Sequence, residues 1–124
     1  MNRTTIAAVS LGCLSLPGSS LLAQTEITPP ASAVTASTTD GNLPGNAVDN
    51  NLTTRWSGNG DGAWLQLDLG ITRRVGFARI AFFNGNLRRS RFDLQVSNAA
   101  GVWTNVLTNV ESSGTTTASR TAAS

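Results

Sequence analysis

The segment WLQLDL, residues 64–69, carries a leucine at every second position. In an extended chain this spacing places Leu65, Leu67 and Leu69 on one face, because successive side chains of a strand point to opposite sides. A period of two over six residues is typical of a half-buried β-strand. The segment therefore predicts a strand whose leucine face covers a hydrophobic core.

Three more apolar runs of strand length follow, over residues 75–83, 92–96 and 102–107, separated by short stretches containing glycine. Residues 92–96 alternate like the first run, whereas residues 75–83 are apolar on both faces, as in the central strand of a sandwich. Short strands at regular spacing with glycine and asparagine turns indicate an all-β sandwich or barrel. No stretch beyond the N-terminal segment has helical spacing over three turns.

Composition narrows the function. The chain has 124 residues, enough for one domain, with 40% hydrophobic and 13% charged residues. Its positive charges are all arginines, they give a net charge of only +2, and they form no basic run. This argues against a nucleic-acid partner. The chain has no His and no Tyr and one Cys, so most nucleophile–base and zinc chemistry lacks its residues.

The first 23 residues resemble a secretory signal peptide. A positive start at Arg3 precedes an apolar stretch over residues 6–16, a Pro17-Gly18 break and a small residue, Ala23, at the expected cleavage point. The apolar stretch is too short for stable membrane insertion. A buried helix and a lipid-modified Cys13 are the alternatives. We expect an exported protein, secreted or periplasmic, that has no cysteine after cleavage.

The remaining chain divides into a domain over residues 24–117 and a tail over residues 118–124. Residues 112–124 are Ser, Thr and Ala with one Arg and one Gly, and they lack apolar periodicity. Such a composition predicts a disordered tail. Four or five strands precede it, fewer than a closed sandwich usually contains.

The line NAVDNNLTTRWS, residues 46–57, resembles the signature of the discoidin family, also known as the coagulation-factor type C domain. The resemblance continues through residues 62–70, 75–85 and 92–97, in the same order as in the family. Residues 82–92 are most similar to the carbohydrate-binding modules beside bacterial alginate lyases. The likeness fades near Thr117, and the family's last strands have no counterpart in the sequence.

The resemblance implies a jelly-roll β-sandwich that is incomplete at its C-terminus and binds ligand with the loops at one end. It also implies a secreted, non-catalytic carbohydrate-binding module, a fragment of a larger polysaccharide-degrading protein and tethered to its catalytic domain. The expected partner is a polysaccharide or glycan.

By the same resemblance, a structural calcium ion would lie behind the loop at residues 49–56. Asp49 would supply a carboxylate, Asn51 a carbonyl and Thr54 a hydroxyl, which are the oxygen ligands that calcium prefers. Asn50 stands where the family usually has glycine, and asparagine tolerates a left-handed backbone. The alternative is an Asx-turn, in which Asp49 bonds only its own backbone.

The candidate glycan site lies around the turn Asn84-Gly85-Asn86 and the following Arg88 and Arg89. A guanidinium fork matches the carboxylate of a uronate sugar, such as those of alginate, in a two-point contact. The amides of Asn84 and Asn86 are suited to sugar hydroxyls. The alternative is a solvated hairpin whose arginines serve solubility.

Trp56 and Trp64 are expected in the core, with stacking on sugar rings as the alternative, and Trp103 in the core or at an edge. An adhesion module that binds a cell-surface protein or lipid is the alternative function, although the loops expose few apolar tips, Leu43 and Leu87. A lyase or hydrolase is less favoured. A lyase commonly uses Tyr, His or Lys as its base and proton donor, and the chain contains none of these. A hydrolase would have to pair Asp61 with Asp68, and Asp68 lies in the predicted strand.

Overall fold

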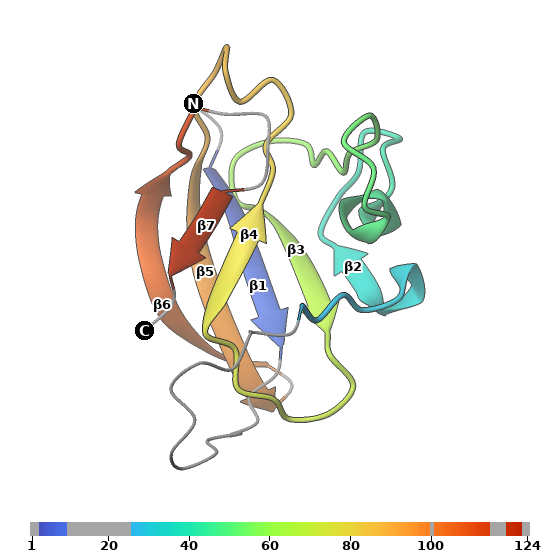
Figure 1. The fold of residues 1–124 in the computed structure, drawn as a ribbon, viewed down its shortest axis with the longest axis vertical. Helices are drawn as coiled ribbons and strands as arrows, with labels where there is room; N and C mark the ends of the chain where they lie inside the picture. The colour runs from blue at the N-terminus through green and yellow to red at the C-terminus, as the bar shows by residue number, and fades with distance from the viewer. Residues whose placement is uncertain (1–2, 10–25, 100, 115–118, 123–124) are drawn as a thin grey trace.

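The computed structural model describes residues 3–9, 26–99, 101–114 and 119–122 (Figure 1). Within these ranges the chain is built from strands joined by loops and two short 3-10 turns. In chain order the elements are β1 (Arg3–Val9), η1 (Ala31–Ala33), β2 (Val34–Ala36), η2 (Pro44–Val48), β3 (Ala63–Asp68), β4 (Phe77–Ile80), β5 (Arg91–Ala99), β6 (Val102–Glu111) and β7 (Ser119–Ala122). No helix in these ranges is long and apolar enough to cross a membrane.

The strands form two layers. The larger sheet has the order β2-β3-β1-β5-β6, and β4 pairs with β7 in a smaller two-stranded sheet. In Figure 1 the smaller sheet lies in front of the larger one. Phe82, just beyond β4, and Phe92 of β5 have ring centroids 5.4 Å apart, so the two layers meet there. The predicted all-β sandwich is thus confirmed, with a second layer of only two described strands.

The core between the layers is small. Phe92 and Leu94 are the most buried apolar residues, with 1% and 2% of their surface exposed. The predicted leucine face of β3 contributes Leu65, which is 6% exposed, whereas Leu69 lies beyond the last residue of the strand. Burying these side chains is the main favourable contribution to folding, at about 25 cal/mol for each Å² of apolar surface.

Strand β5 is covered on both faces. Phe92 and Leu94 lie on one face, while Asp93 on the other is 8% exposed. The Asp93 carboxylate accepts a hydrogen bond of 2.7 Å from the backbone N–H of Asn109 in β6. Asn109 has a left-handed backbone (φ 57°), and the β5–β6 register shifts between Phe92 and Leu94. The carboxylate thereby satisfies a backbone donor near an irregularity in the ladder.

One expectation from the sequence was wrong. The run at residues 75–83 does not form a central strand: β4 covers only Phe77–Ile80 and pairs with β7 alone among the described strands. The chain leaves the strand because it enters a turn, in which the N–H of Gly85 bonds the carbonyl of Phe82 at 3.0 Å. Ser119–Ala122, within the segment for which the sequence predicts a tail, is strand β7, which pairs antiparallel with β4.

The N-terminal segment also has a place in the fold. Arg3–Val9, which the sequence assigns to a signal peptide outside the domain, forms β1 between β3 and β5. Residues 10–23, including Cys13 and the expected cleavage point, lie outside the described residues. Cleavage after Ala23 stays a prediction about the exported chain.

Candidate functional site

A tight turn follows β4 and carries the candidate glycan-binding residues. The carbonyl of Asn84 accepts hydrogen bonds from the N–H groups of Leu87 (2.9 Å) and Arg88 (3.0 Å). Asn84 itself has a left-handed backbone with φ 51°, a conformation that asparagine adopts at low cost. The turn buries Gly85 and leaves the side chains of Asn84, Asn86 and Arg88 exposed at its surface. These three are free to meet a ligand from solvent.

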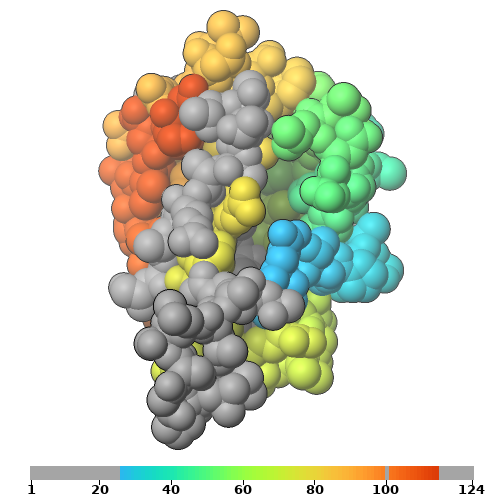
Figure 2. Space-filling model, viewed as in Figure 1, coloured from blue at the N-terminus to red at the C-terminus, as the bar shows by residue number. Residues whose placement is uncertain are grey.

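The turn lies against the loop that joins β2 to β3. In Figure 2 the golden surface of the turn adjoins the green surface of that loop at one end of the molecule. The contact is made by Arg55, whose guanidinium carbon lies 4.0 Å from the centroid of the Phe83 ring. The corresponding distance for Arg88 is 5.9 Å, so two guanidinium groups lie near one aromatic ring. Phe83 is still 42% exposed.

These contacts hold the two arginines in place. The Nε of Arg55 donates to the hydroxyl of Ser57 at 3.0 Å, and the Nε of Arg88 donates to the carbonyl of Phe83 at 3.4 Å. A cation over an aromatic face at an exposed site stabilises by about 0.5–1 kcal/mol. The result is a positive, partly aromatic surface beside the amides of Asn84 and Asn86. Such a surface suits a ligand that carries both carboxylates and hydroxyls.

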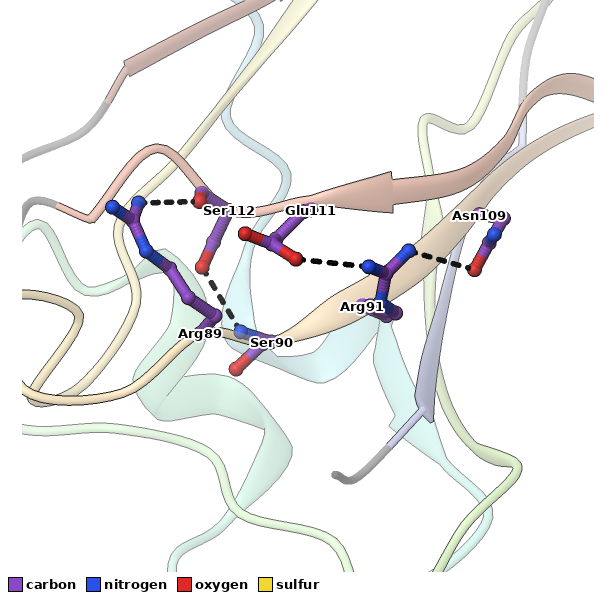
Figure 3. A network of polar contacts seen from close by, with 6 residues as sticks. All are labelled: Arg89, Ser90, Arg91, Asn109, Glu111 and Ser112. Atoms are coloured by element: carbon purple, nitrogen blue, oxygen red, sulfur yellow. Dashed lines mark hydrogen bonds and ion pairs between the residues drawn. The ribbon is translucent and has the colours of Figure 1, made fainter.

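Arg89 has a different environment from Arg88. Its Nη1 donates to the carbonyl of Ser112 at 2.8 Å, just beyond β6 (Figure 3). The guanidinium also packs against Gly114, where an added Cβ would clash with Nη1. The hydroxyl of Ser112 accepts from the N–H of Ser90 at 3.0 Å. Arg89 thus ties the start of β5 to the chain beyond β6, and part of its hydrogen-bonding capacity is used within the domain.

The neighbouring Arg91 belongs to the same edge of the sheet. Its guanidinium makes an ion pair of 3.0 Å with Glu111 and a hydrogen bond of 3.5 Å with Asn109 (Figure 3). The side chains of Arg91 and Glu111 are 40% and 42% exposed, so this ion pair contributes little to stability. Its geometry shows that Arg91 faces β6 rather than the candidate ligand surface.

The proposed calcium ligands come together in the loop after η2. The two carboxylate oxygens of Asp49 accept from the N–H of Asn51 (2.9 Å) and the hydroxyl of Thr54 (2.5 Å). The Thr54 hydroxyl also lies 3.0 Å from the backbone carbonyl of Asn51. The side-chain amide oxygen of Asn51 instead bonds Thr53. One carboxylate, one hydroxyl and one backbone carbonyl therefore converge. The hydrogen bond from the N–H of Asn51 to the Asp49 carboxylate is also the bond that defines an Asx-turn.

This oxygen set fits a calcium ion in kind, because calcium prefers carboxylate, carbonyl and hydroxyl oxygens. It provides one negative charge, and no group of three or more His, Cys, Asp or Glu side chains able to hold a metal occurs in the described part of the chain. Asn50 fills the turn position with φ 57°, as expected for a residue standing in place of glycine. The backbone is thus shaped as the sequence predicted.

A set of polar contacts fixes the rest of this loop. The indole N–H of Trp56 donates to the carbonyl of Thr38 at 3.0 Å, and the N–H of Asn59 donates to the Thr38 hydroxyl at 2.9 Å. Gly58 allows this close packing, since an added Cβ would lie 2.8 Å from the Trp56 ring and 2.7 Å from Ala63. Trp56 is half-buried and braces the loop that carries Arg55.

Asp40 lies near the beginning of the loop that joins β2 to β3. Its carboxylate accepts from the side-chain amide of Asn42 at 2.8 Å and from the Asn42 N–H at 3.0 Å. These hydrogen bonds, first that of the side chain, lower the pKa of Asp40 below its ordinary value of 3.8, and the charge of Arg55 adds a smaller effect. Asp40 is therefore anionic at neutral pH.

The three tryptophans do not share one environment. Trp56 and Trp103 are half-buried, whereas Trp64 is 39% exposed on β3, so the expectation of Trp64 in the core was wrong. Its ring lies on the face of β3 opposite Leu65, because neighbouring residues of a strand alternate.

Asp68, considered for catalysis, is the last residue of β3. Its carboxylate accepts a hydrogen bond of 2.8 Å from the N–H of Gly70 in the turn that follows the strand.

The structure thus brings Asn84, Asn86 and Arg88 to one turn and directs Arg89 toward Ser112. It adds Arg55 and Phe83, which the sequence analysis did not select. Arg55 belongs to the family-like line at residues 46–57, yet only the folded chain brings it to the Phe83 ring. The described residues thus define an all-β domain with a cationic, partly aromatic surface at one end, and this surface rather than the fold is what argues for a function.

The sequence places the chain in a family. It matches the F5/8 type C domain over residues 32–123, so the chain belongs to that family, and the resemblance seen in the sequence is confirmed. A comparison with curated proteins gave no match.

Two similar solved structures agree with this assignment. One is described as the CBM32 of AlyQ in complex with 4,5-unsaturated mannuronic acid. It is 37% identical with a TM-score of 0.73, and the match covers 80% of this chain and 77% of that one. The other is a truncated AlyQ with CBM32 and alginate lyase domains. It is 40% identical with a TM-score of 0.71, and the match covers 74% of this chain but 24% of that one.

Proposed function

We propose that the chain is a non-catalytic carbohydrate-binding module for an acidic polysaccharide such as alginate. The observation that carries this proposal is the pair of guanidinium groups, Arg55 and Arg88, whose central carbons lie 4.0 Å and 5.9 Å from the centroid of the exposed Phe83 ring. The similarity to a CBM32 described in complex with 4,5-unsaturated mannuronic acid supports it. That ligand carries a carboxylate, a group that a guanidinium binds through two parallel hydrogen bonds.

The binding surface has a role for each kind of side chain. Arg55 and Arg88 would pair with uronate carboxylates, and the amides of Asn84 and Asn86 would bond ring hydroxyls. The exposed part of Phe83 would contact the apolar C–H face of a sugar ring. A surface this open favours modest affinity for one sugar chain. Tethering to a catalytic domain would raise the effective affinity, and the similarity to a protein with CBM32 and alginate lyase domains supports such a tether.

The test is a calorimetric titration of the protein with sodium oligomannuronate and, separately, with a neutral oligosaccharide of the same length. We expect binding of the acidic ligand alone, weakening as salt is raised. Replacing Arg88→Gln should reduce its affinity about 10-fold, the effect of losing about 1.4 kcal/mol. Equal affinity for both oligosaccharides would contradict the proposed preference.

Arg73→Gln is the matched control. Arg73 is an exposed arginine in the loop before β4, whereas the candidate surface follows the other end of that strand. The substitution removes the same charge, so a general electrostatic effect would weaken binding in both variants. A loss limited to Arg88→Gln supports a specific contact.

We also propose that the Asp49 loop holds a structural calcium ion, through the Asp49 carboxylate, the Thr54 hydroxyl and a carbonyl of Asn51. When bound, calcium would fix the loop that carries Arg55. A ligand at 100 times its Kd stabilises the folded state by about 2.7 kcal/mol, which would appear as a higher Tm. Asp49→Asn should abolish this shift, with magnesium as the control ion. A Tm that is equal in calcium and in chelator would refute the site.

Export is part of the same proposal, since an alginate-binding module acts where the polymer is. The N-terminal positive start and apolar stretch support a cleaved signal peptide. Expression in a bacterium with an intact export pathway, followed by mass spectrometry of the exported product, should give a chain beginning at Gln24. A product retained inside the cell with Met1 in place would contradict it.

Binding to a lipid surface is the second candidate function. Leu43, Leu52 and Leu87 lie in the loops that carry the candidate site and are exposed by 60%, 66% and 78%. Apolar tips of this kind can insert into a bilayer surface. Co-sedimentation with vesicles of phosphatidylcholine and phosphatidylserine tests this function, and Leu87→Ser should weaken it. Binding to vesicles with no binding to oligomannuronate would favour this second function over the first.

A further inference from the structure

The middle of the larger sheet is filled by the most N-terminal strand. β1 pairs in parallel with β3 over Thr4–Val9 and Ala63–Asp68, and in parallel with β5 over Arg3–Val9 and Arg91–Ser97. The other three pairings of the described strands, β2–β3, β5–β6 and β4–β7, are antiparallel. Among the described strands, β1 is therefore the one whose pairings are all parallel.

Removing β1 would leave a gap that β3 and β5 cannot close by themselves. Adjacent strands lie about 4.8 Å apart, so strands on either side of a missing one are separated by about 10 Å. The backbone N–H and C=O groups that face the gap would then have no partners in the sheet, which is costly near a core. Leu65 in β3, and Phe92 and Leu94 in β5, are buried residues of the two strands that flank this gap.

The two strand edges that face β1 have the geometry to pair with a strand of either direction. β3 and β5 run the same way, since each is parallel to β1, so an inserted strand is parallel to both or antiparallel to both. Antiparallel ladders are slightly more stable for each residue than parallel ones. A parallel occupant is therefore open to replacement by an antiparallel one of similar sequence.

We propose that the gap between β3 and β5 is a strand-binding site, and that Arg3–Val9 is its displaceable occupant in the uncleaved chain. A chain without residues 1–23 would present this site open. The assignment goes beyond glycan binding and does not depend on it, because the gap lies inside the sheet and not on the loops.

The register defines which segment the site accepts. Ile6 lies level with Leu65 and Leu94, and Ala8 lies level with Leu67 and Val96. Arg3–Val9 contains no proline and reads RTTIAAV, with small or apolar residues over its second half. The fitting occupant is thus an extended segment of about six residues that is small or apolar at alternate positions.

Hydrogen exchange on the full chain gives the first test. The protein is produced without export, so that the N-terminus is retained, and mass spectrometry verifies Met1. We expect the amides of residues 4–9 to exchange as slowly as those in the middle of β3 and β5. Exchange at the rate of an unstructured peptide would overturn the proposal.

A proline variant tests the pairing. Ala7→Pro removes one backbone donor, and in an inner strand every N–H faces one neighbour or the other. We expect faster exchange in β1 and in the facing parts of β3 and β5. Ser19→Pro, in the same N-terminal segment but outside the described strands, is the control. Equal exchange patterns for the two variants would count against β1.

A cut after folding tests displacement. A site for a specific protease is inserted between Ala23 and Gln24 of the full chain, and the folded protein is then cleaved. We expect the fragment of residues 1–23 to co-elute with the remainder, and an excess of labelled peptide spanning residues 2–10 to replace it. Release of the fragment with loss of the cooperative melt supports the site as well. Release with an unchanged Tm would refute the site. A dimer in light scattering of the full chain, as an exchange of β1 between two copies would give, would refute occupancy within one chain.

Discussion

At the scale of single residues, the Asp40 carboxylate allows a direct electrostatic prediction. The Asn42 side chain and N–H stabilise the Asp40 carboxylate, so its pKa lies below 3.8 in the folded chain. A lowered pKa adds stability that is present above pH 3.8 and is lost as the pH falls through the folded value. We expect NMR titration to give this low pKa and Asn42→Ala to move it back toward 3.8. An unchanged value in the variant would contradict the assigned cause.

Arg88 and Arg89 are adjacent, yet we expect them to differ in role. Arg89 donates to the Ser112 carbonyl, and losing a hydrogen bond from a charged donor costs about 1.5–3 kcal/mol. Arg89→Ala should therefore lower the free energy of unfolding by about that amount and leave the oligomannuronate affinity of the folded fraction unchanged. Urea melts and calorimetry on the same samples test both parts. An Arg89→Ala variant that is stable but binds weakly would instead assign Arg89 to the ligand.

At the scale of elements, the Asp49 loop depends on a left-handed backbone at Asn50. Its φ of 57° is accessible to glycine and asparagine but costs about 1–2 kcal/mol for most other residues. We expect Asn50→Gly to keep the Tm close to that of the natural chain and Asn50→Val to lower the free energy of unfolding by that amount. Thermal melts in chelator isolate this backbone effect from any effect of calcium. Equal melts for Gly and Val would show that the loop adapts.

The β5–β6 hairpin depends on a buried carboxylate. Asp93 accepts the N–H of Asn109, so Asp93→Ala would leave a backbone donor without this acceptor near the core. The cost of such a donor is about 1–3 kcal/mol. We expect the free energy of unfolding to fall by that amount, and the amide of Asn109 to lose protection from exchange. Protection that persists in the variant would show that another acceptor replaces the carboxylate.

At the scale of the whole molecule, stability rests on few buried side chains. Phe92 is 1% exposed and contacts Phe82 of the other layer, so it joins both sheets. Truncating such a residue costs about 3–5 kcal/mol, much of the 5–15 kcal/mol that holds a typical domain. We expect the Phe92→Ala variant either to show no cooperative thermal transition or to unfold with a midpoint close to 25 °C. Phe83→Ala is the control, since that ring is 42% exposed and should matter less for folding.

The features that could be predicted from the sequence are those that depend on residues close together in the chain. The strands at residues 64–69 and 92–96 were predictable because alternation with a period of two is written in neighbouring residues. The turn at Asn84 and the bend at Asn50 were predictable from asparagine in a local motif. The exposure of Trp64 was not, because an aromatic residue in a strand pattern does not reveal which face the rest of the chain covers.

The sequence by itself therefore determined the all-β class, the family and the turn that presents Asn84, Asn86 and Arg88, since these depend on residues close together in the chain. Only the tertiary structure decided that Arg55 lies over Phe83, that Arg89 binds Ser112, and that Arg3–Val9 lies between β3 and β5. The physical reason is that sheet pairing and loop contacts join residues far apart in sequence. Their choice depends on which edges, faces and charges the rest of the fold leaves open.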